Sequence, residues 1–453
     1  MRLRFASIRA TCGLACADVL RSSTRPMKPD RRPAAERVEM QKGEALREWR
    51  SGWPLILTGL AGSTCVGAHI YPLGTVMKPL AAQYGWARAE ISAGATISSI
   101  CTMLLATFVG LLLDRYGARR VALIGTPLCA VIMSLLTFAG PEIWTWYAIW
   151  TLYALVVLLI LPIVWGAAIA SAFHASRGLA LAVGLSGSGV AAAVYPPLTL
   201  WLLETFGIRG VYPGLGLFTL LFLGPLVLFA FKPRPVNVAA EASDGRPVWG
   251  LTLGQALRTN MLWRVVLVLA IAAIAASAVN VHIQPLLTDR GMTPVEAASI
   301  AAALGPSVLI GRWLGGVLLD RFHARWIALA FYLLPAAGCV LLLQFDGAYV
   351  RALLAAILIG LSVGVEGDLL PFLLSRYFGL RHFGAIYGLG MAAFGAGYAV
   401  GPFAAGLLFD TSGSYDVGLI AVAVALAAAG LVALSYGRYP DAEGRGAPGT
   451  RSV

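Results

Sequence analysis

Charged side chains are scarce in this sequence. Asp, Glu, Lys and Arg together make up only 12% of the 453 residues, whereas soluble domains contain about 25%. Hydrophobic residues reach 58%, and the mean hydropathy is +0.78. A soluble globular protein is therefore excluded, and the composition predicts a chain that is embedded in a lipid bilayer.

Cysteines are also few, and the usual signatures of enzymes are missing. The six cysteines follow no regular spacing, which predicts neither a disulfide framework nor a metal site. The sequence has no nucleotide-binding glycine loop and no Ser-His-Asp arrangement in a fitting context. We therefore expect no cofactor, no enzymatic activity and no ATP-driven pump.

Long apolar runs dominate the chain instead. A transmembrane helix needs about 20 apolar residues, and none of the runs alternates as a barrel strand would. Twelve such runs lie near residues 52–76, 91–113, 121–139, 146–172, 178–203, 210–231, 263–287, 297–320, 326–344, 349–374, 383–409 and 415–436. The sequence thus predicts an all-α membrane protein with twelve transmembrane helices.

A polar stretch with several prolines separates the sixth run from the seventh, and it indicates a linker. Six helices then lie on each side of it. We expect residues 1–50 to form a basic cytoplasmic tail that is disordered or an over-extended start. Two six-helix bundles follow at 51–231 and 263–437, joined by a cytoplasmic linker at 232–262, and residues 438–453 form a second cytoplasmic tail.

The two bundles carry traces of an internal duplication. One loop reads Gly110-Leu-Leu-Leu-Asp114-Arg115-Tyr-Gly117-Ala-Arg119-Arg120, and a degraded copy reads Gly316-Val-Leu-Leu-Asp320-Arg321-Phe-His323-Ala-Arg325-Trp326, at an offset of 206 residues. The same offset relates three further pairs: Pro196 and Pro402, Glu204 and Asp410, and Gly207 and Gly413. Two pseudo-symmetric halves are what alternating access to a site between them requires.

The charge distribution indicates how the chain lies in the membrane. With both termini inside, the inner loops hold thirteen Lys and Arg residues and the outer loops hold five, as the positive-inside rule demands. The net charge of +12 and the pI of about 9.7 are thereby explained without nucleic-acid binding. We expect a multi-pass protein of the cell (inner) membrane with no obligatory protein partner.

The twelve runs, the duplicated halves and the Gly-x-x-x-Asp-Arg-x-Gly-x-Arg-Arg loop resemble the major facilitator superfamily. Two segments are similar to its branch of monocarboxylate transporters and oxalate/formate antiporters: Tyr84-Gly-Trp-Ala-Arg88-Ala-Glu-Ile91, and Gly397-Tyr398-Ala-Val-Gly401-Pro402 running into Asp410-Thr-Ser-Gly413-Ser-Tyr415. The resemblance implies a carrier of small organic anions, commonly together with protons.

The Asp-Arg loops have two interpretations. Either they form a latch that holds one conformation, or their arginines simply anchor the chain at the anionic inner leaflet. The latch residues would be Gly110, Asp114, Arg115, Gly117, Arg119, Arg120, Asp320 and Arg321. The second copy departs from the pattern, because His323 replaces the glycine and Trp326 the last arginine.

Three charged residues lie within apolar runs: Arg312, Glu366 and Asp368. An ionisable group at the bilayer centre costs about 2.5–3.5 kcal/mol even on lenient scales, so such residues are rarely idle. The resemblance implies that Arg312 binds the substrate anion, whereas a common alternative is a salt bridge to the tenth helix. Related transporters often carry an acidic residue one turn earlier, where this chain has Val308. We therefore expect proton coupling through Glu366 and Asp368, with a structural salt bridge to Arg312 as the alternative.

Polar side chains also mark matching depths of the first and seventh helices. His69 and Tyr71 lie on the first, and Asn280, His282 and Gln284 lie on the seventh. These five residues are candidates to line the substrate path, because polar groups on apolar helices often face water. Interhelical hydrogen bonds are the alternative for the histidines.

The sequence thus predicts a secondary carrier that moves a mono- or dicarboxylate in symport with a proton. Two alternatives are carboxylate exchange and proton-driven efflux of amphipathic drugs, for which a wide apolar cavity would suffice. A membrane sensor built on a carrier fold is disfavoured by the short linker.

Overall fold

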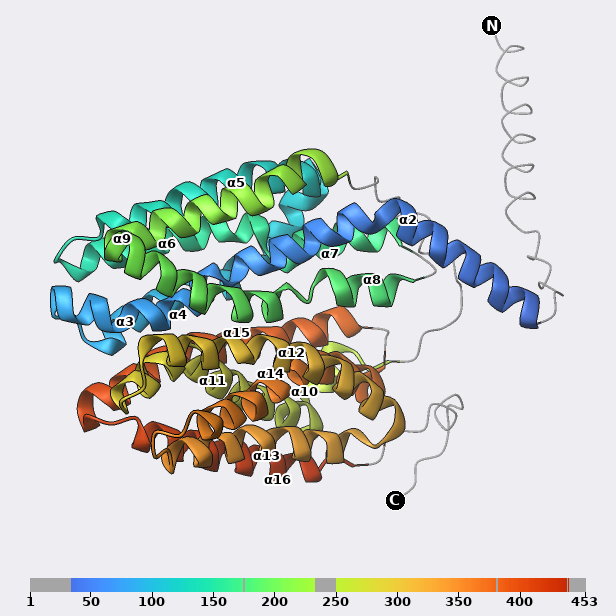
Figure 1. Cartoon of the computed structure of the whole chain (residues 1–453). Coiled ribbons are helices and arrows are strands. Elements are labelled where there is room, and N and C mark those ends of the chain that lie inside the picture. Colours follow the sequence, from blue (N-terminus) through green and yellow to red (C-terminus); the bar gives the residue numbers. More distant parts are fainter. Residues whose placement is uncertain (1–33, 174–175, 233–249, 380–381, 438, 440–453) are drawn as a thin grey trace, which may run out of the picture.

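The computed structural model describes residues 34–173, 176–232, 250–379, 382–437 and 439, and within them it is all helical except for one isolated bridge. Two helical bundles lie side by side, the first built from α2–α9 and the second from α10–α16 (Figure 1). The helices of the first bundle are α2 (Ala34–Val66), η1 (Gly67–His69), α3 (Tyr71–Tyr84), α4 (Arg88–Tyr116), α5 (Ala118–Leu135), η2 (Leu136–Phe138), α6 (Ile143–Val157), η3 (Leu158–Ile160), α7 (Pro162–Ala172), α8 (Arg177–Gly184), α9 (Gly187–Pro225) and the π-helix η4 (Leu226–Ala230). Those of the second are α10 (Leu253–Leu257), α11 (Asn260–Asp289), α12 (Pro294–Arg321), α13 (Ala324–Leu343), α14 (Tyr349–Phe378), α15 (Phe383–Ser412) and α16 (Asp416–Leu434).

The twelve expected apolar runs fall on helical segments, and several of them are divided between consecutive helices. By length and composition, ten helices of the described residues are candidates to cross a membrane. One of these candidates, Leu179–Ala230, contains two of the expected runs. Its helix α9 is broken at Gly207, where φ is 68° and ψ is −179°, a conformation that only glycine adopts readily.

Helices of the first bundle are interrupted near their middles. The first expected span breaks between α2 and α3, just before Pro72. The fourth breaks at Leu161, whose ψ of 157° follows from its place before Pro162. Trp165 stabilises this second break, because its buried indole N–H donates to the carbonyl of Ile160 at 2.8 Å. Trp165 is thus a packing residue.

Helices of the second bundle run without such breaks, and glycines bring two of them into close contact. A Cβ atom added to Gly311 on α12 would lie 2.1 Å from the carbonyl oxygen of Leu361 on α14, and one added to Gly364 would lie 2.1 Å from that of Val308. Small residues allow such close approach in membranes. This contact places Arg312 directly against α14.

Two expected boundaries differ from the structure. Helix α2 begins at Ala34, well before the expected end of the tail near residue 50, and residues 1–33 lie outside the described part. The last part of the expected linker is folded onto the second bundle: Leu251 N–H donates to Phe378 at 2.8 Å, and Ala256 of α10 is fully buried. Linker residues 233–249 also lie outside the described part.

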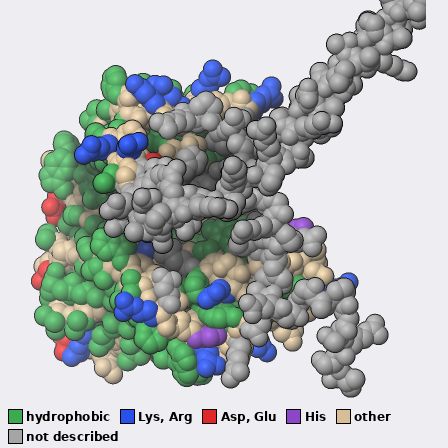
Figure 2. Space-filling view, turned by 90° about the vertical axis from the view of Figure 1, so that its right-hand side faces the viewer, with side chains coloured by type: hydrophobic (Ala, Val, Ile, Leu, Met, Phe, Trp, Pro, Cys, Tyr) green, Lys and Arg blue, Asp and Glu red, His purple; other side chains and the backbone are tan. Residues whose placement is uncertain are grey.

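Basic side chains lie at one end of the molecule (Figure 2), which also carries the start of α2 and the end of α16 (Figure 1). We call this end, which carries residue 232 and the start of α10, the inner end, and the opposite end the outer end. Arg115, Arg120 and Arg321 are exposed there. The outer end carries the turns at Gly85, Gly291 and Gly413.

Candidate functional site

Arg312 lies on the face of α12 that packs against α14. A Cβ atom added to Gly367 of α14 would come 3.0 Å from its Nη2 atom, and one added to Gly364 would come 2.7 Å from its backbone nitrogen. The two glycines are three residues apart and share one helix face. The guanidinium group therefore lies closely against α14 at a position where residue 367 has no side chain.

The side chain of Glu366 projects from α14 in a different direction, away from the face that contacts Arg312. Its side chain is only 5% exposed, and its Oε1 atom lies 3.5 Å from the hydroxyl oxygen of Ser362, whose own proton is donated to the carbonyl of Phe331 at 2.5 Å. It lines a cavity of about 10 Å³, room for one water molecule at most, together with Ala276, Cys339 and Leu426 from α11, α13 and α16. Glu366 is therefore a carboxyl group in an apolar chamber of the second bundle. The side chain of Asp368 lies outside the described part of the structure.

Tyr71 and Asn280 are brought together around Tyr398 of α15. The side chains of Asn280, Tyr71 and Glu366 are all close enough to the Tyr398 hydroxyl for electrostatic interaction. Tyr71 also packs against the hydrophobic cores of both bundles. This cluster joins the first and second bundles near the break between α2 and α3.

His69 lies at that break. Its Nδ1 atom is in hydrogen-bond contact with the carbonyl oxygen of Val66, the last residue of α2. A helix end leaves carbonyl groups without intrahelical partners, and His69 satisfies one of them. The contact assigns a local structural interaction to His69.

His282 and Gln284 lie in seams between the bundles rather than beside Arg312. Gln284 accepts a hydrogen bond from Thr75 of α3 at 2.8 Å. His282 is 3% exposed, and its Nε2 atom lies 2.9 Å from the carbonyl of Pro402 and 3.2 Å from the hydroxyl of Ser92 of α4. Its Nδ1 atom lies 2.9 Å from the hydroxyl of Tyr415.

A charged cluster follows at the outer end. Arg88 of α4 lies 2.6 Å from Asp289 of α11, and Lys78 of α3 lies 3.0 Å from the same carboxylate. The Arg88 guanidinium also donates to Tyr415 at 2.7 Å and stacks 3.7 Å above the ring of Phe409. The side chain of Arg88 is 12% exposed, so its contacts are largely shielded from solvent, and they bind the two bundles together.

The first Asp-Arg loop turns at Gly117, whose φ is 77°. Arg119 donates to the carbonyl of Leu228, in the middle of η4, at 3.0 Å. In the second copy His323 has φ of −68° and caps α13 instead, so the two loops differ in conformation because only the first has a glycine. Of the other latch candidates, Gly110, Asp114 and Asp320 lie outside the residues whose side chains are described.

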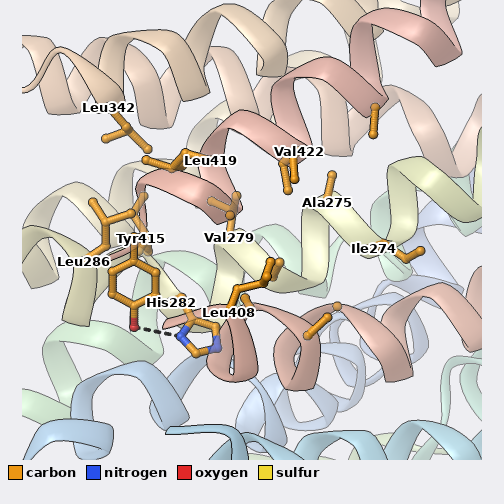
Figure 3. Close-up of a pocket in the computed structure, with 18 of the residues that line it drawn as sticks. Ile274, Ala275, Val279, His282, Leu286, Leu342, Leu408, Tyr415, Leu419 and Val422 are labelled. Carbon is orange, nitrogen blue, oxygen red and sulfur yellow. Dashed lines mark hydrogen bonds between the residues drawn. The ribbon is translucent and has the colours of Figure 1, made fainter. Parts of the chain in front are cut away.

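An apolar cavity of about 230 Å³ lies within the second bundle, between α11, α15 and α16 (Figure 3). Its wall consists mainly of small aliphatic residues such as Ala275, Val279 and Leu408, with His282 and Tyr415 at one end. The described residues that line it include no Lys or Arg. This cavity is therefore unsuited to a carboxylate.

The outer cluster was not predicted from the sequence, although Arg88 and Tyr415 lie in two of the quoted segments. Arg88 is the first residue of α4, Asp410 lies in the last turn of α15, and Tyr415 follows that helix. The offset of 206 between Glu204 and Asp410 was the available signal. It identified a repeated acidic residue but did not say which helix that residue would contact.

Comparison with known proteins identifies the fold and the family. The sequence profile of the Major Facilitator Superfamily matches residues 56–389. Human monocarboxylate transporter 11 is 26% identical over 385 residues, which cover 82% of this chain and 79% of that protein. The MFS-type transporter YcxA of Bacillus subtilis is 24% identical, over 79% of this chain and 88% of that protein.

Solved structures agree on the fold. The nucleoside transporter NupG superposes with a TM-score of 0.68 at 12% identity, over 84% of this chain and 98% of that one. These relatives are transporters, which points to a carrier and not to an enzyme. The chain therefore belongs to the major facilitator superfamily, as a multi-pass membrane transporter that resembles the monocarboxylate transporters.

Proposed function

We propose that this transporter carries a small organic anion, a mono- or dicarboxylate, in symport with a proton. Twelve membrane-spanning helices in two halves would alternate the site between the two sides of the membrane, with both termini cytoplasmic and the protein in the cell (inner) membrane. The observation that carries the proposal is Arg312, a cation within an apolar helix of a chain whose relatives are named monocarboxylate transporters.

The geometry around Arg312 supports anion binding. A guanidinium group binds a carboxylate through two parallel hydrogen bonds, and Gly364 and Gly367 leave room for it beside α14. Tyr71, Asn280 and Tyr398 form the second polar cluster, and they would orient the rest of the substrate. In this account His282 and Gln284 act in the contact between the bundles, and His69 in the broken first helix.

Glu366 would take the coupled proton. Transfer of an ionised carboxylate into an apolar chamber is costly unless a cation compensates it, and the lining residues of this chamber are apolar apart from Ser362. A proton on Glu366 removes that cost. As the two halves move, the chamber would open to water on one side of the membrane or the other, and Glu366 would exchange its proton with that water.

The proposal is tested by uptake of labelled mono- and dicarboxylates into liposomes that contain the purified protein. Arg312→Ala should reduce uptake by at least about 30-fold, since loss of a charged partner in a buried site costs about 2–5 kcal/mol. Arg312→Lys should remain impaired because lysine lacks the planar fork. Arg351→Ala is the matched control, because Arg351 pairs with Asp346 in an exposed loop.

The outcomes distinguish the alternatives. Uptake that needs an opposite carboxylate inside but no proton gradient would indicate exchange and remove the role of Glu366. No carboxylate uptake by folded protein, together with resistance to amphipathic drugs in an overexpressing strain, would favour the efflux carrier. Normal transport by both Arg312 variants would refute the role of Arg312.

A further inference from the structure

Asp410 of α15 caps the first turn of α4, a helix of the other bundle. The N–H of Ala89 donates to Oδ2 of Asp410 at 2.9 Å, and the N–H of Arg88 donates to Oδ1 at 3.1 Å. The first N–H groups of a helix have no intrahelical acceptor, and the positive end of the helix dipole favours a carboxylate. One bundle thus supplies the cap that the other bundle needs.

Helix α4 cannot satisfy these two groups itself. Its N-cap residue is Ala87, which has no side-chain acceptor, and Glu90 bonds back to the N–H of Ala87 at 2.9 Å. Gly406 of α15 makes the approach possible, because a Cβ atom there would lie 2.7 Å from the Cα of Ala89. The N-terminus of α4 therefore lacks a cap of its own, and its close packing against α15 allows a residue of that helix to supply one.

Further contacts continue this seam in both directions. Thr96 of α4 donates to the carbonyl of Ala399 of α15 at 2.6 Å, deeper in the bundle. Nearer the outer surface, Arg88 contacts Asp289 and Tyr415. The seam between α4 and α15 is thus closed from its middle to its outer end by polar contacts between the two bundles.

The pseudo-symmetric seam, between α9 and α12, is built differently. Glu204 occupies the position equivalent to Asp410, but α12 is capped by its own Thr293, whose hydroxyl accepts the N–H of Glu296 at 3.2 Å. Pro294 at the first position of α12 has no N–H to offer. Glu204 is exposed and lines a cavity of about 460 Å³ together with Pro294.

We propose that the α4–α15 seam is the outer gate of this transporter and that Asp410 is its latch. The proposal rests on the alternating-access part of the proposed function and does not depend on the substrate. When the gate opens, the hydrogen bonds between Asp410 and the first N–H groups of α4 break, and both partners bind water instead. The α9–α12 seam has no such latch, so the two seams contribute unequally to closure.

The free energy of the latch is small enough for the gate to open during transport and large enough to favour the closed gate at rest. Loss of a helix cap changes an equilibrium by about tenfold, which corresponds to about 1.4 kcal/mol. Asp410→Ala should therefore raise the population with an open outer gate by about tenfold. Glu204→Ala should not change it, although the two residues are equivalent by the internal duplication.

The test uses a cysteine at Ser92, which is fully buried in the seam. In purified Ser92→Cys protein without substrate, site-resolved mass spectrometry follows alkylation of residue 92 and of native Cys129, which is buried within the first bundle. Adding Asp410→Ala should accelerate alkylation at residue 92 about tenfold and leave Cys129 protected. Asp410→Asn, which keeps one carbonyl acceptor, should give an intermediate rate.

An unchanged rate in the Asp410→Ala protein would overturn the proposal, and so would an equal increase in the Glu204→Ala protein. Alkylation of Cys129 in the Asp410→Ala protein would show that this variant has lost its fold. The alkylation rates at residue 92 in the Asp410→Asn and Glu204→Gln proteins are then compared by the same criteria. Because no carboxylate is present in this assay, failure of the substrate assignment would leave its result intact, and the two proposals fail independently.

Discussion

The imidazole of His282 lies between two oxygen atoms, with Nε2 2.9 Å from the carbonyl of Pro402 and Nδ1 2.9 Å from the hydroxyl of Tyr415. A carbonyl oxygen only accepts, so Nε2 carries the proton. Burial raises the pKa of the Tyr415 phenol well above its usual range. The hydroxyl therefore donates to Nδ1 of the neutral ring while its oxygen accepts from Arg88.

This arrangement predicts that His282 stabilises the closed outer end and does not bind substrate. His282→Phe should remove both hydrogen bonds and lower the maximal transport rate severalfold. Carboxylate affinity, measured by isothermal titration calorimetry, should change by less than about threefold. A loss of binding as large as that of Arg312→Ala would instead place His282 in the substrate site.

Gly367 should control substrate affinity through Arg312. The added Cβ of Gly367→Ala would lie 3.0 Å from the mobile end of the Arg312 side chain, so the guanidinium must shift without disturbing the fold. We expect a several-fold rise in the KM for the carboxylate at unchanged thermal stability. Gly388→Ala on α15, where a Cβ meets nothing within 4 Å, is the control. Equal KM values for the two variants would contradict this role.

Glu366→Gln should separate substrate movement from proton movement. The amide keeps the shape of the side chain and its place beside the Ser362 hydroxyl, but it cannot release a proton. Exchange of labelled for unlabelled carboxylate should persist, whereas accumulation driven by a proton gradient should disappear. Glu142→Gln, in an exposed position before α6, should leave both activities unchanged. Gradient-driven accumulation by Glu366→Gln would exclude it as the proton carrier.

The contact between α12 and α14 should be sensitive to a single methyl group. The Cβ of Gly364→Ala would lie 2.1 Å from the carbonyl oxygen of Val308, and rigid backbone cannot move away cheaply. Overpacking of this kind costs about 1–3 kcal/mol, so the melting temperature in detergent should fall by several degrees. Gly316→Ala on the partner helix α12 meets nothing within 4 Å and should melt normally. Similar melting temperatures would show that the two helices separate easily.

Helix positions were predictable because each apolar run is about as long as a membrane is thick. The breaks before Pro72 and Pro162 follow from the backbone restriction that proline imposes on the preceding residue. The relation between the bundles was visible in the loops at Asp114 and Asp320 and in the offset of 206 residues.

Helix rotation was not predictable, because apolar residues cover all faces of these helices and no periodicity marks the buried one. For that reason the sequence could not show that Glu366 faces a chamber of the second bundle while Arg312 faces α14. It also could not distinguish His282 in a seam from His282 in a substrate path. The cap from Asp410 joins residues more than 300 positions apart, and no local pattern reports such a contact.

The central claim is that a carboxylate and a proton cross the membrane together, and the internal pH of protein-containing liposomes tests it most directly. With a pH-sensitive dye inside and the membrane potential clamped at zero, external addition of a transported carboxylate should acidify the interior with saturation. The acidification should be absent in Arg312→Ala and present in Arg351→Ala. Uptake of labelled carboxylate by the unaltered protein with no change of internal pH would contradict the account.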